Sequence, residues 1–231
     1  MPALGGGTPP APTRASVVRN SLGVAVATGA YGVSFGAVGV AAGLSVAQTC
    51  ALSLLLFSGA SQFALAGVVA SGGAPMAGAL SAVLLGTRNA LYGIRLGSLL
   101  GLRGWRRIVG AQVVIDESTA MAVGRPDREL ARVGFWTTGI GVFVLWNSAT
   151  AVGAVVGDTL GDPRSYGLDA AVSAAFLALL WPRLSSPTAR LAAVLAAALA
   201  IGAVPLTVAG VPVLLAVVVA VALGVPGRLA R

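Results

Sequence analysis

Two arginines and a tyrosine interrupt an apolar run at residues 75–101, which is long enough to cross a membrane. Arg88, Tyr92 and Arg95 fall at positions i, i+4 and i+7, on one face of a helix. An arginine at the membrane centre costs about 2.5–3.5 kcal/mol on insertion scales, so its side chain should face protein or water. Arg95 lies near the end of the run, where its side chain can extend to the membrane surface. Arg88 is therefore the better functional candidate, and we expect it to face the bundle interior beside an acidic or carbonyl partner.

Two adjacent acids, Asp116 and Glu117, precede Ser118 inside another apolar run at residues 108–124. Neighbouring residues of a helix point about 100° apart, so the two carboxylates are not expected to share one partner. We expect Asp116 to pair with Arg88. Glu117 is then the candidate ion-coupling residue, because desolvation favours the protonated form of a carboxyl group. The alternative is a peripheral segment in which both acids contact water.

The stretch Phe57-Ser58-Gly59-Ala60-Ser61-Gln62-Phe63 places small and polar residues between two apolar half-helices. A helix broken at mid-membrane exposes backbone N–H and C=O groups that can bind the carboxylate and amine of a substrate. We expect Ser61 and Gln62 to donate or accept hydrogen bonds with these groups, and Gly59 to allow close backbone approach. The alternative is a continuous helix in which Ser58 and Ser61 bond back to carbonyl groups.

The composition places these residues in an integral membrane protein. Of the 231 residues, 57% are hydrophobic and 10% charged, and the mean hydropathy is +0.91. Soluble domains are about a quarter charged, so the composition argues strongly against a water-soluble enzyme. The net charge of +8 comes from arginines placed mostly between apolar runs, which argues against a nucleic-acid-binding surface. Cys50 has no second cysteine to pair with and is expected to be a packing residue.

The chain lacks the residues that several kinds of catalysis require. The chain has no histidine, so imidazole is absent as a proton carrier, zinc ligand or general base. It has no lysine and therefore no nucleotide-binding loop of the G-x-x-x-x-G-K-[ST] kind. An intramembrane enzyme would also need a nucleophile elbow or a metal set, which the sequence lacks. We expect no enzyme activity, no cofactor and no metal.

The elements that must position these residues are helices, because lipid satisfies no backbone polar groups. We predict an all-α polytopic bundle of about seven or eight apolar helical segments, one or two of them broken or re-entrant. A disordered tail is expected at residues 1–17 and a single transmembrane domain at 18–231. The predicted segments are 18–43, 46–71, 75–101, 108–124, 133–157, 168–183, 189–205 and 208–226.

Arginine placement predicts cytoplasmic N- and C-termini, with an acidic loop at 158–169 outside. Segment 108–124 conflicts with this rule, since three arginines precede it and three follow it. Either the rule fails once, or this segment is re-entrant or lies sideways. If it does not cross, segment 46–71 is not expected to cross simply either, because parity must be restored.

Glycines recur at the spacing that allows close helix contact in lipid. The pairs Gly32/Gly36 and Gly39/Gly43 and the series Gly93, Gly97 and Gly101 fit this pattern.

Asn147 lies in the middle of segment 133–157, and we expect it to be structural. An internal repeat is suggested only by the similarity of residues 43–45 and 167–169, and shared Ala/Leu-rich composition explains that similarity better.

These motifs together resemble the AzlC family, the large subunit of bacterial branched-chain amino acid exporters. The similarity spans about residues 20–185. The matching motifs are Tyr31 to Gly36, Gly43 to Ser45, Phe57 to Phe63, Arg88 with Leu91 to Gly93, Asp116 to Ser118 and Gly167 to Asp169. The resemblance implies export of leucine, isoleucine, valine or similar neutral amino acids across the bacterial cytoplasmic membrane. It also implies a small AzlD-type membrane subunit as partner.

One departure from the family affects the expected mechanism. Members usually carry Arg-His where this chain has Arg88-Asn89. Proton coupling would therefore depend on Asp116 or Glu117, or be absent. The candidate substrate-binding residues are Tyr31, Phe35, Ser58, Gly59, Ser61, Gln62, Arg88, Asn89 and Tyr92. The alternative to a secondary transporter is a structural or assembly subunit whose polar residues only join helices.

Overall fold

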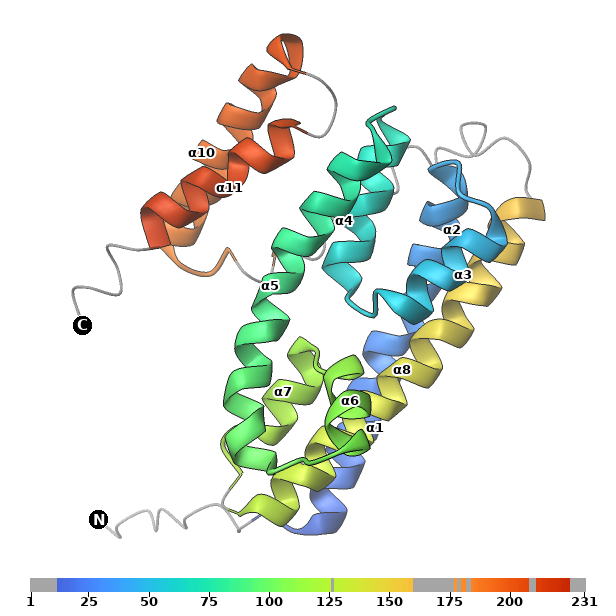
Figure 1. The fold of residues 1–231 in the computed structure, drawn as a ribbon, viewed down its shortest axis with the longest axis vertical. Helices are drawn as coiled ribbons and strands as arrows, with labels where there is room; N and C mark the ends of the chain where they lie inside the picture. The colour runs from blue at the N-terminus through green and yellow to red at the C-terminus, as the bar shows by residue number, and fades with distance from the viewer. Residues whose placement is uncertain are drawn as a thin grey trace, which may run out of the picture.

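The computed structural model describes residues 12–125, 127–159, 177, 180, 181, 184–207 and 211–224, and these residues form helices joined by short turns (Figure 1). No strand occurs among them, which confirms the all-α class. Three helices are long and apolar enough to span a membrane, at 14–41, 128–159 and 187–206. The helices are α1 (Arg14–Ala30), α2 (Gly32–Ala41), α3 (Val46–Leu55), α4 (Gly59–Ala70), α5 (Pro75–Leu100), α6 (Trp105–Gln112), α7 (Asp116–Ala122), α8 (Arg128–Thr159), α10 (Pro187–Ala203), the short 3-10 helix η3 (Val204–Leu206) and α11 (Val211–Gly224).

The scaffold is a pair of long helices, in which α1 and α2 together lie along α8. Residue numbers rise together across the contact: Gly134 lies beside Val17, and Gly157 lies beside Ala37. The α1–α2 segment and α8 therefore run parallel to each other. The predicted Gly32/Gly36 pair forms part of the contact, since a Cβ on either glycine would collide with the backbone of α8. Small residues here let the backbones touch, and van der Waals contact replaces the hydrophobic driving force that lipid does not supply.

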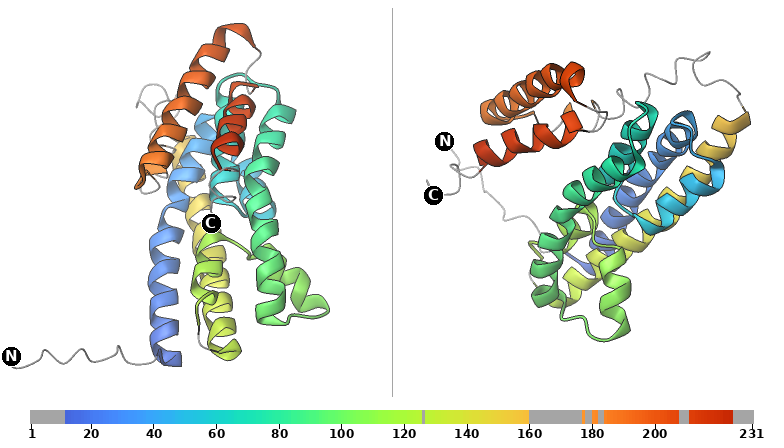
Figure 2. Two further views of the ribbon diagram at one scale, coloured as in Figure 1. Left: turned by 90° about the vertical axis from the view of Figure 1, so that its left-hand side faces the viewer. Right: turned by 45° about the horizontal axis from the view of Figure 1, so that its top comes forward.

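Helices α3 and α4 form a hairpin that enters from the end of the bundle where α2 terminates and returns to that end (Figures 1 and 2). Near its start, Thr49 of α3 contacts Gly39; further along, the Ser53 hydroxyl donates to Thr150 Oγ1 at 3.4 Å. The chain then turns at residues 56–58, and α4 runs back. The predicted break in segment 46–71 is confirmed. It lies at 56–58, so Ser61 and Gln62 are inside α4.

Helices α6 and α7 form a second hairpin, which enters from the opposite end (Figure 1). Gly110 of α6 lies against Trp136, the tip residue Val113 lies against Gly139, and Met121 of α7 lies beside Gly134. The hairpin therefore rises along α8 to a tip at residues 113–115 and descends again. Of the alternatives left open for segment 108–124, the hairpin fits the re-entrant one, because the chain returns to the end that it came from.

Helix α5 connects the two hairpins and runs antiparallel to α4. Gly78 faces Leu65 and Gly86 faces Ser61. The helix ends at Gly101, whose φ of 60° suits glycine, and Arg132 Nε donates to the Leu100 carbonyl at 2.8 Å. This bond joins the end of α5 to the start of α8.

The prediction that glycine spacing marks helix contact holds for Gly39, which packs against Thr49 of α3, but fails for Gly43, Gly93 and Gly97. Nothing among the described atoms lies within 4 Å of a Cβ built on Gly93 or Gly97. Gly43 has a φ of 94° and ends α2 rather than packing against a helix. Small residues permit close contact, but a neighbouring helix must also be present, and spacing alone carries no information about that.

The second hairpin explains the arginine pattern. Because α6 and α7 return to the end they came from, the arginines on both sides of this segment lie at one end of the bundle (Figure 1). The starts of α1 and α8 lie at the same end. The turns at 42–45 and 71–74, at the other end, contain no arginine. With this hairpin, both sets of arginines lie at one end of the bundle, which is the arrangement that the positive-inside rule expects.

The first helix begins earlier than expected, whereas the last two helices match predicted segments. Helix α1 begins at Arg14, so the boundary expected after residue 17 lies too late. Thr13 and Ser16 form a capping box that starts the helix, and Val17 is fully buried. Helices α10 and α11 pack together as a pair and correspond to predicted segments 189–205 and 208–226. The predicted segment 168–183, the loop 158–169 and the motif 167–169 lie wholly or mostly outside the described residues.

Candidate functional site

A cavity of about 560 Å³ lies where the tips of the two hairpins meet. One tip contributes Phe57 to Ala60, and the other contributes Ile115 to Glu117. Helices α1, α5 and α8 form most of the remaining wall, together with Tyr31 and Leu180. The remaining lining residues are Ala27, Thr28, Tyr31, Leu85, Arg88, Asn89, Val142, Trp146 and Leu180. Seven of the predicted site residues therefore share one cavity: Tyr31, Ser58, Gly59, Arg88, Asn89, Asp116 and Glu117.

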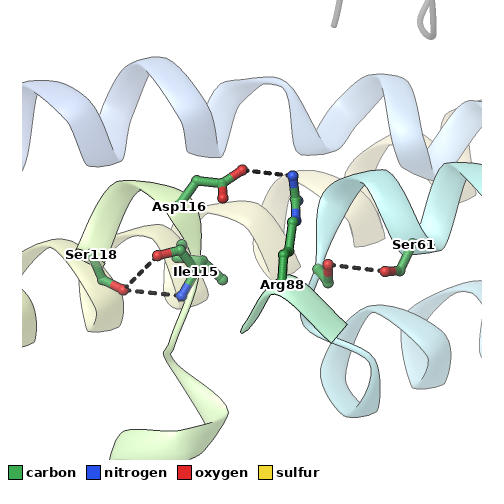
Figure 3. Close-up of polar contacts among 6 residues, drawn as sticks. Ser61, Arg88, Ile115, Asp116 and Ser118 are labelled. Carbon is green, nitrogen blue, oxygen red and sulfur yellow. Dashed lines mark hydrogen bonds and ion pairs between the residues drawn. The ribbon is translucent and has the colours of Figure 1, made fainter. Parts of the chain in front are cut away.

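The first tip presents the N-terminus of α4 to the cavity. Ser58 is the N-cap residue, but its side chain makes no capping bond and donates instead to Ser61 Oγ at 3.1 Å (Figure 3). The first backbone bond of the helix is made by the amide of Gln62 to the Ser58 carbonyl. The N–H groups of Gly59 and Ala60 thus have no acceptor within the helix. They give the cavity backbone donors and the partial positive charge of a helix N-terminus.

The interior position of Arg88 is confirmed. Its Nη1 lies 2.9 Å from Asp116 Oδ2, and the two side chains are 27% and 26% exposed (Figure 3). This ion pair links the middle of α5 to the tip of the second hairpin. The pairing expected between Arg88 and one of the two acids is therefore present, and Asp116 is the partner. Arg95, by contrast, is exposed on the surface of α5.

Two buried polar atoms beside the ion pair have no hydrogen-bond partner among the described residues. They are Arg88 Nε and Asn89 Oδ1. One is a donor and the other an acceptor, and both belong to residues that line the cavity. Leaving such atoms unsatisfied costs about 1–3 kcal/mol each, which a polar ligand in the cavity can offset.

The second tip is held by Ser118. Its hydroxyl donates to the carbonyl of Val113 at 2.6 Å. It also accepts from the Ile115 amide at 3.1 Å, a bond drawn in Figure 3. These bonds close the turn between α6 and α7. Asp116 and Glu117 then occupy the first turn of α7, where negative charge is favourable. Both side chains line the cavity despite their different directions from the helix axis.

Gln62 is fully buried and does not line the cavity. Its Nε2 donates to the Ser53 carbonyl at 3.3 Å, and its Oε1 accepts from Trp146 Nε1 at 3.1 Å. Gln112 acts similarly, donating to the Leu54 carbonyl at 2.8 Å. The two amides satisfy carbonyls that the end of α3 leaves without helical partners. The structure therefore places Gln62 behind the cavity wall. Ser61 does not line the cavity either, and its hydroxyl is hydrogen-bonded to Ser58, which does.

Three aromatic candidates lie in different places. Tyr31, at the junction of α1 and α2, lines the cavity. Phe35 is fully buried; it stacks with Trp146 at a centroid distance of 6.4 Å and meets Phe63 edge-on at 5.5 Å. Tyr92 packs against the second core cluster, with Leu96 and Leu100, and is not among the lining residues. Of these three, only Tyr31 is placed to contact a ligand.

The sequence analysis missed the apolar wall of the cavity. Phe57, Ile115, Val142 and Trp146 all line it, and each is at most 7% exposed. Trp146 was noticeable as a tryptophan in the middle of an apolar run, but nothing in the sequence showed which way it points. Its indole lies over Gly59, where an added Cβ would come within 3.3 Å. The neighbouring Asn147 donates to the Phe143 carbonyl at 2.7 Å, in keeping with a structural role.

The geometry can be compared with known proteins. A family model described as AzlC protein matches residues 23–160. An uncharacterized membrane protein of Archaeoglobus fulgidus is 30% identical over 161 residues, which cover 69% of this chain and 70% of that protein. No solved structure matches the chain. Among the described residues, no group of three or more histidine, cysteine or acidic side chains is placed to hold a metal ion.

Proposed function

The chain belongs to the AzlC family of membrane proteins, which generally serve in branched-chain amino acid transport, and from this premise we propose that it is a secondary transporter exporting branched-chain or similar neutral amino acids. The observation that carries the proposal is the cavity between the hairpin tips. It combines a helix N-terminus, an arginine, two carboxylates and an apolar wall.

An amino acid has two charged groups and a side chain, and the cavity offers a counterpart to each. The α4 N-terminus and the Ser58 hydroxyl suit the carboxylate, because backbone N–H groups and the helix dipole favour negative charge. Broken helices in other transporters use their N-termini in this way. Glu117 suits the ammonium group, while Asp116 is neutralised by Arg88. Phe57, Ile115, Val142 and Trp146 suit a branched apolar side chain.

Export against a gradient requires coupling to an ion, and Glu117 is the residue we assign to this role. It lines the cavity, and its neighbour Asp116 is held in an ion pair. A carboxyl that shares a cavity with the substrate can link protonation to binding, because a neutral acid attracts the ammonium group less. Asn89, at the position where the family usually has histidine, does not titrate.

The arginine-bearing end of the bundle is assigned to the cytoplasm of a bacterial cell. The starts of α1 and α8 and the base of the second hairpin all carry arginine at this end. The N-terminus is then cytoplasmic, and the C-terminus is expected there too. The first hairpin enters from outside and the second from inside, so the cavity between their tips lies near mid-membrane. We further propose a small AzlD-type membrane subunit as partner.

The proposal is tested by measuring efflux of labelled amino acids from cells or vesicles, with and without a coexpressed small subunit. A panel of leucine, isoleucine, valine, serine and lysine should show faster efflux of the branched-chain members. A matched control is Arg95→Leu, which removes an arginine from α5 outside the cavity. Equal efflux from cells with and without the protein, with the partner present, would contradict the proposal and favour an assembly subunit.

A further inference from the structure

A second cavity, of about 620 Å³, lies at the arginine-bearing end, between α6 and the first turns of α8. It is separate from the cavity at the hairpin tips and shares no lining residue with it. Three arginines line it: Arg103 and Arg106 at the start of the second hairpin, and Arg132 on α8. No ion pair joins any of them to a carboxylate among the described residues. The mouth of this cavity therefore carries concentrated positive charge.

The other half of the cavity is apolar. Val109, Ile140 and Trp136 form its walls. Arg132 and Ile140 are about 12 Å apart along α8, at about 1.5 Å of rise per residue. The cavity thus changes from cationic to apolar along the direction of the helices. Val109 and Ile140 are 43% and 49% exposed, so the apolar half opens toward the lipid side of the bundle.

Two tryptophans line this cavity: Trp136 lies on α8 between Arg132 and Ile140, and Trp105 begins α6 beside Arg106. Trp136 packs edge-on against Phe135, with ring centroids 5.2 Å apart. Trp105 is 69% exposed, and the Arg106 guanidinium lies 5.8 Å from its ring centroid. Tryptophan is enriched at the level of lipid headgroups, where its ring is in an apolar layer and its N–H meets polar groups.

We propose that this cavity binds the phosphate headgroup of an anionic phospholipid, with an acyl chain lying along Val109 and Ile140. Arginine forms charge-assisted hydrogen bonds to phosphate oxygens, and basic pockets between membrane helices hold anionic headgroups by this chemistry. A free phosphate ion would use the arginines but not the apolar half. The bound lipid would join α6 to α8 and so brace the base of the hairpin whose tip carries Asp116 and Glu117.

The test compares thermal unfolding of the purified full-length protein in detergent with added lipid. Phosphatidylglycerol should raise the Tm, whereas phosphatidylcholine with the same acyl chains and inorganic phosphate alone should not. Arg106→Gln should weaken phosphatidylglycerol binding about fivefold, from about 1 kcal/mol for each arginine near a lipid surface. Arg107→Gln is the matched control, because Arg107 is the next residue of α6, loses the same charge and does not line the cavity.

A second variant tests the apolar half without changing charge. Ile140→Trp should fill the space for the acyl chain and reduce the Tm shift produced by phosphatidylglycerol. Equal losses in Arg106→Gln and Arg107→Gln would overturn the proposal, since they would indicate general surface attraction. A Tm shift with inorganic phosphate as large as that with phosphatidylglycerol would also overturn it, because the site would then bind a free anion.

Discussion

The side-chain amide of Gln112 donates a hydrogen bond of 2.8 Å to the backbone carbonyl of Leu54. Gln112 is the last residue of α6, and Leu54 lies in the last turn of α3. The bond therefore ties together the two hairpins, which enter the bundle from opposite ends, at the level of the cavity between their tips. A movement of one hairpin tip relative to the other would therefore act directly on this bond.

Replacing Gln112 with Leu should uncouple the hairpin tips. The variant keeps the side-chain size but leaves the Leu54 carbonyl without its donor, which we expect to cost about 1 kcal/mol in the free energy of unfolding. Transport should change more than stability, because the bond joins the two hairpins whose tips form part of the cavity wall. Efflux rate and thermal unfolding are measured together. Gln112→Glu, which removes the donor with almost no change of shape, should behave like the leucine variant.

Replacing Arg88 with Leu should abolish transport and lower stability. Asp116 would lose its cation inside the bundle, and we expect a cost of about 2 kcal/mol, below the range for fully buried pairs because both side chains are about a quarter exposed. The double variant Arg88→Leu with Asp116→Asn should recover stability but not efflux. Arg95→Leu should be mild. Normal efflux by Arg88→Leu would remove Arg88 from the site.

Replacing Gln62 with Leu should abolish transport, because Trp146 loses its hydrogen-bond partner, while the protein still inserts in the membrane. The substitution leaves Trp146 Nε1 and the Ser53 carbonyl without their partner, at a cost of about 1–3 kcal/mol. The indole should then shift against Gly59 in the cavity wall. Tryptophan fluorescence in Gln62→Leu and in Trp146→Phe reports this shift. Unchanged fluorescence together with unchanged efflux would contradict the assigned role.

Two glycine substitutions form a matched pair. Gly36→Ala should disrupt folding, because a Cβ there would collide with the Thr150 carbonyl and the backbone of Ala154, neither of which can move without separating α2 from α8. Gly97→Ala meets nothing within 4 Å and should be neutral or stabilise α5 by up to about 1 kcal/mol. Expression level and Tm of the two variants distinguish them. Similar behaviour would contradict the parallel packing of α2 and α8.

Replacing Glu117 with Gln fixes the neutral form of the side chain. The variant should exchange labelled substrate across vesicle membranes but should not respond to an imposed pH gradient, because the group that links protonation to binding is lost. Exchange and gradient-driven accumulation are measured in the same vesicles. If Glu117→Gln still concentrates substrate as the pH gradient dictates, coupling resides elsewhere.

The sequence alone determined the class of the protein and the position of its irregularities. Apolar runs with few charges require membrane helices, since lipid cannot satisfy an exposed backbone. The polar stretch around Ser58 predicted the first interrupted segment, and the arginines on both sides of segment 108–124 offered re-entry as one of three alternatives for the second. The cost of an isolated arginine predicted that Arg88 has a partner inside the bundle.

Only the tertiary structure decided how these pieces meet. Both breaks turned out to be hairpin tips that approach each other from opposite ends, an arrangement that depends on contacts between residues far apart in sequence. The roles of Gln62 and Trp146 depend on the same contacts: a buried amide needs partners, but the sequence does not show whether the partner is a substrate or an indole. The local sequence shows that a polar side chain in an apolar run needs a partner, because leaving it unpaired in lipid is costly. Which group pairs with Gln62 is decided by the packing of α3, α4 and α8 around it.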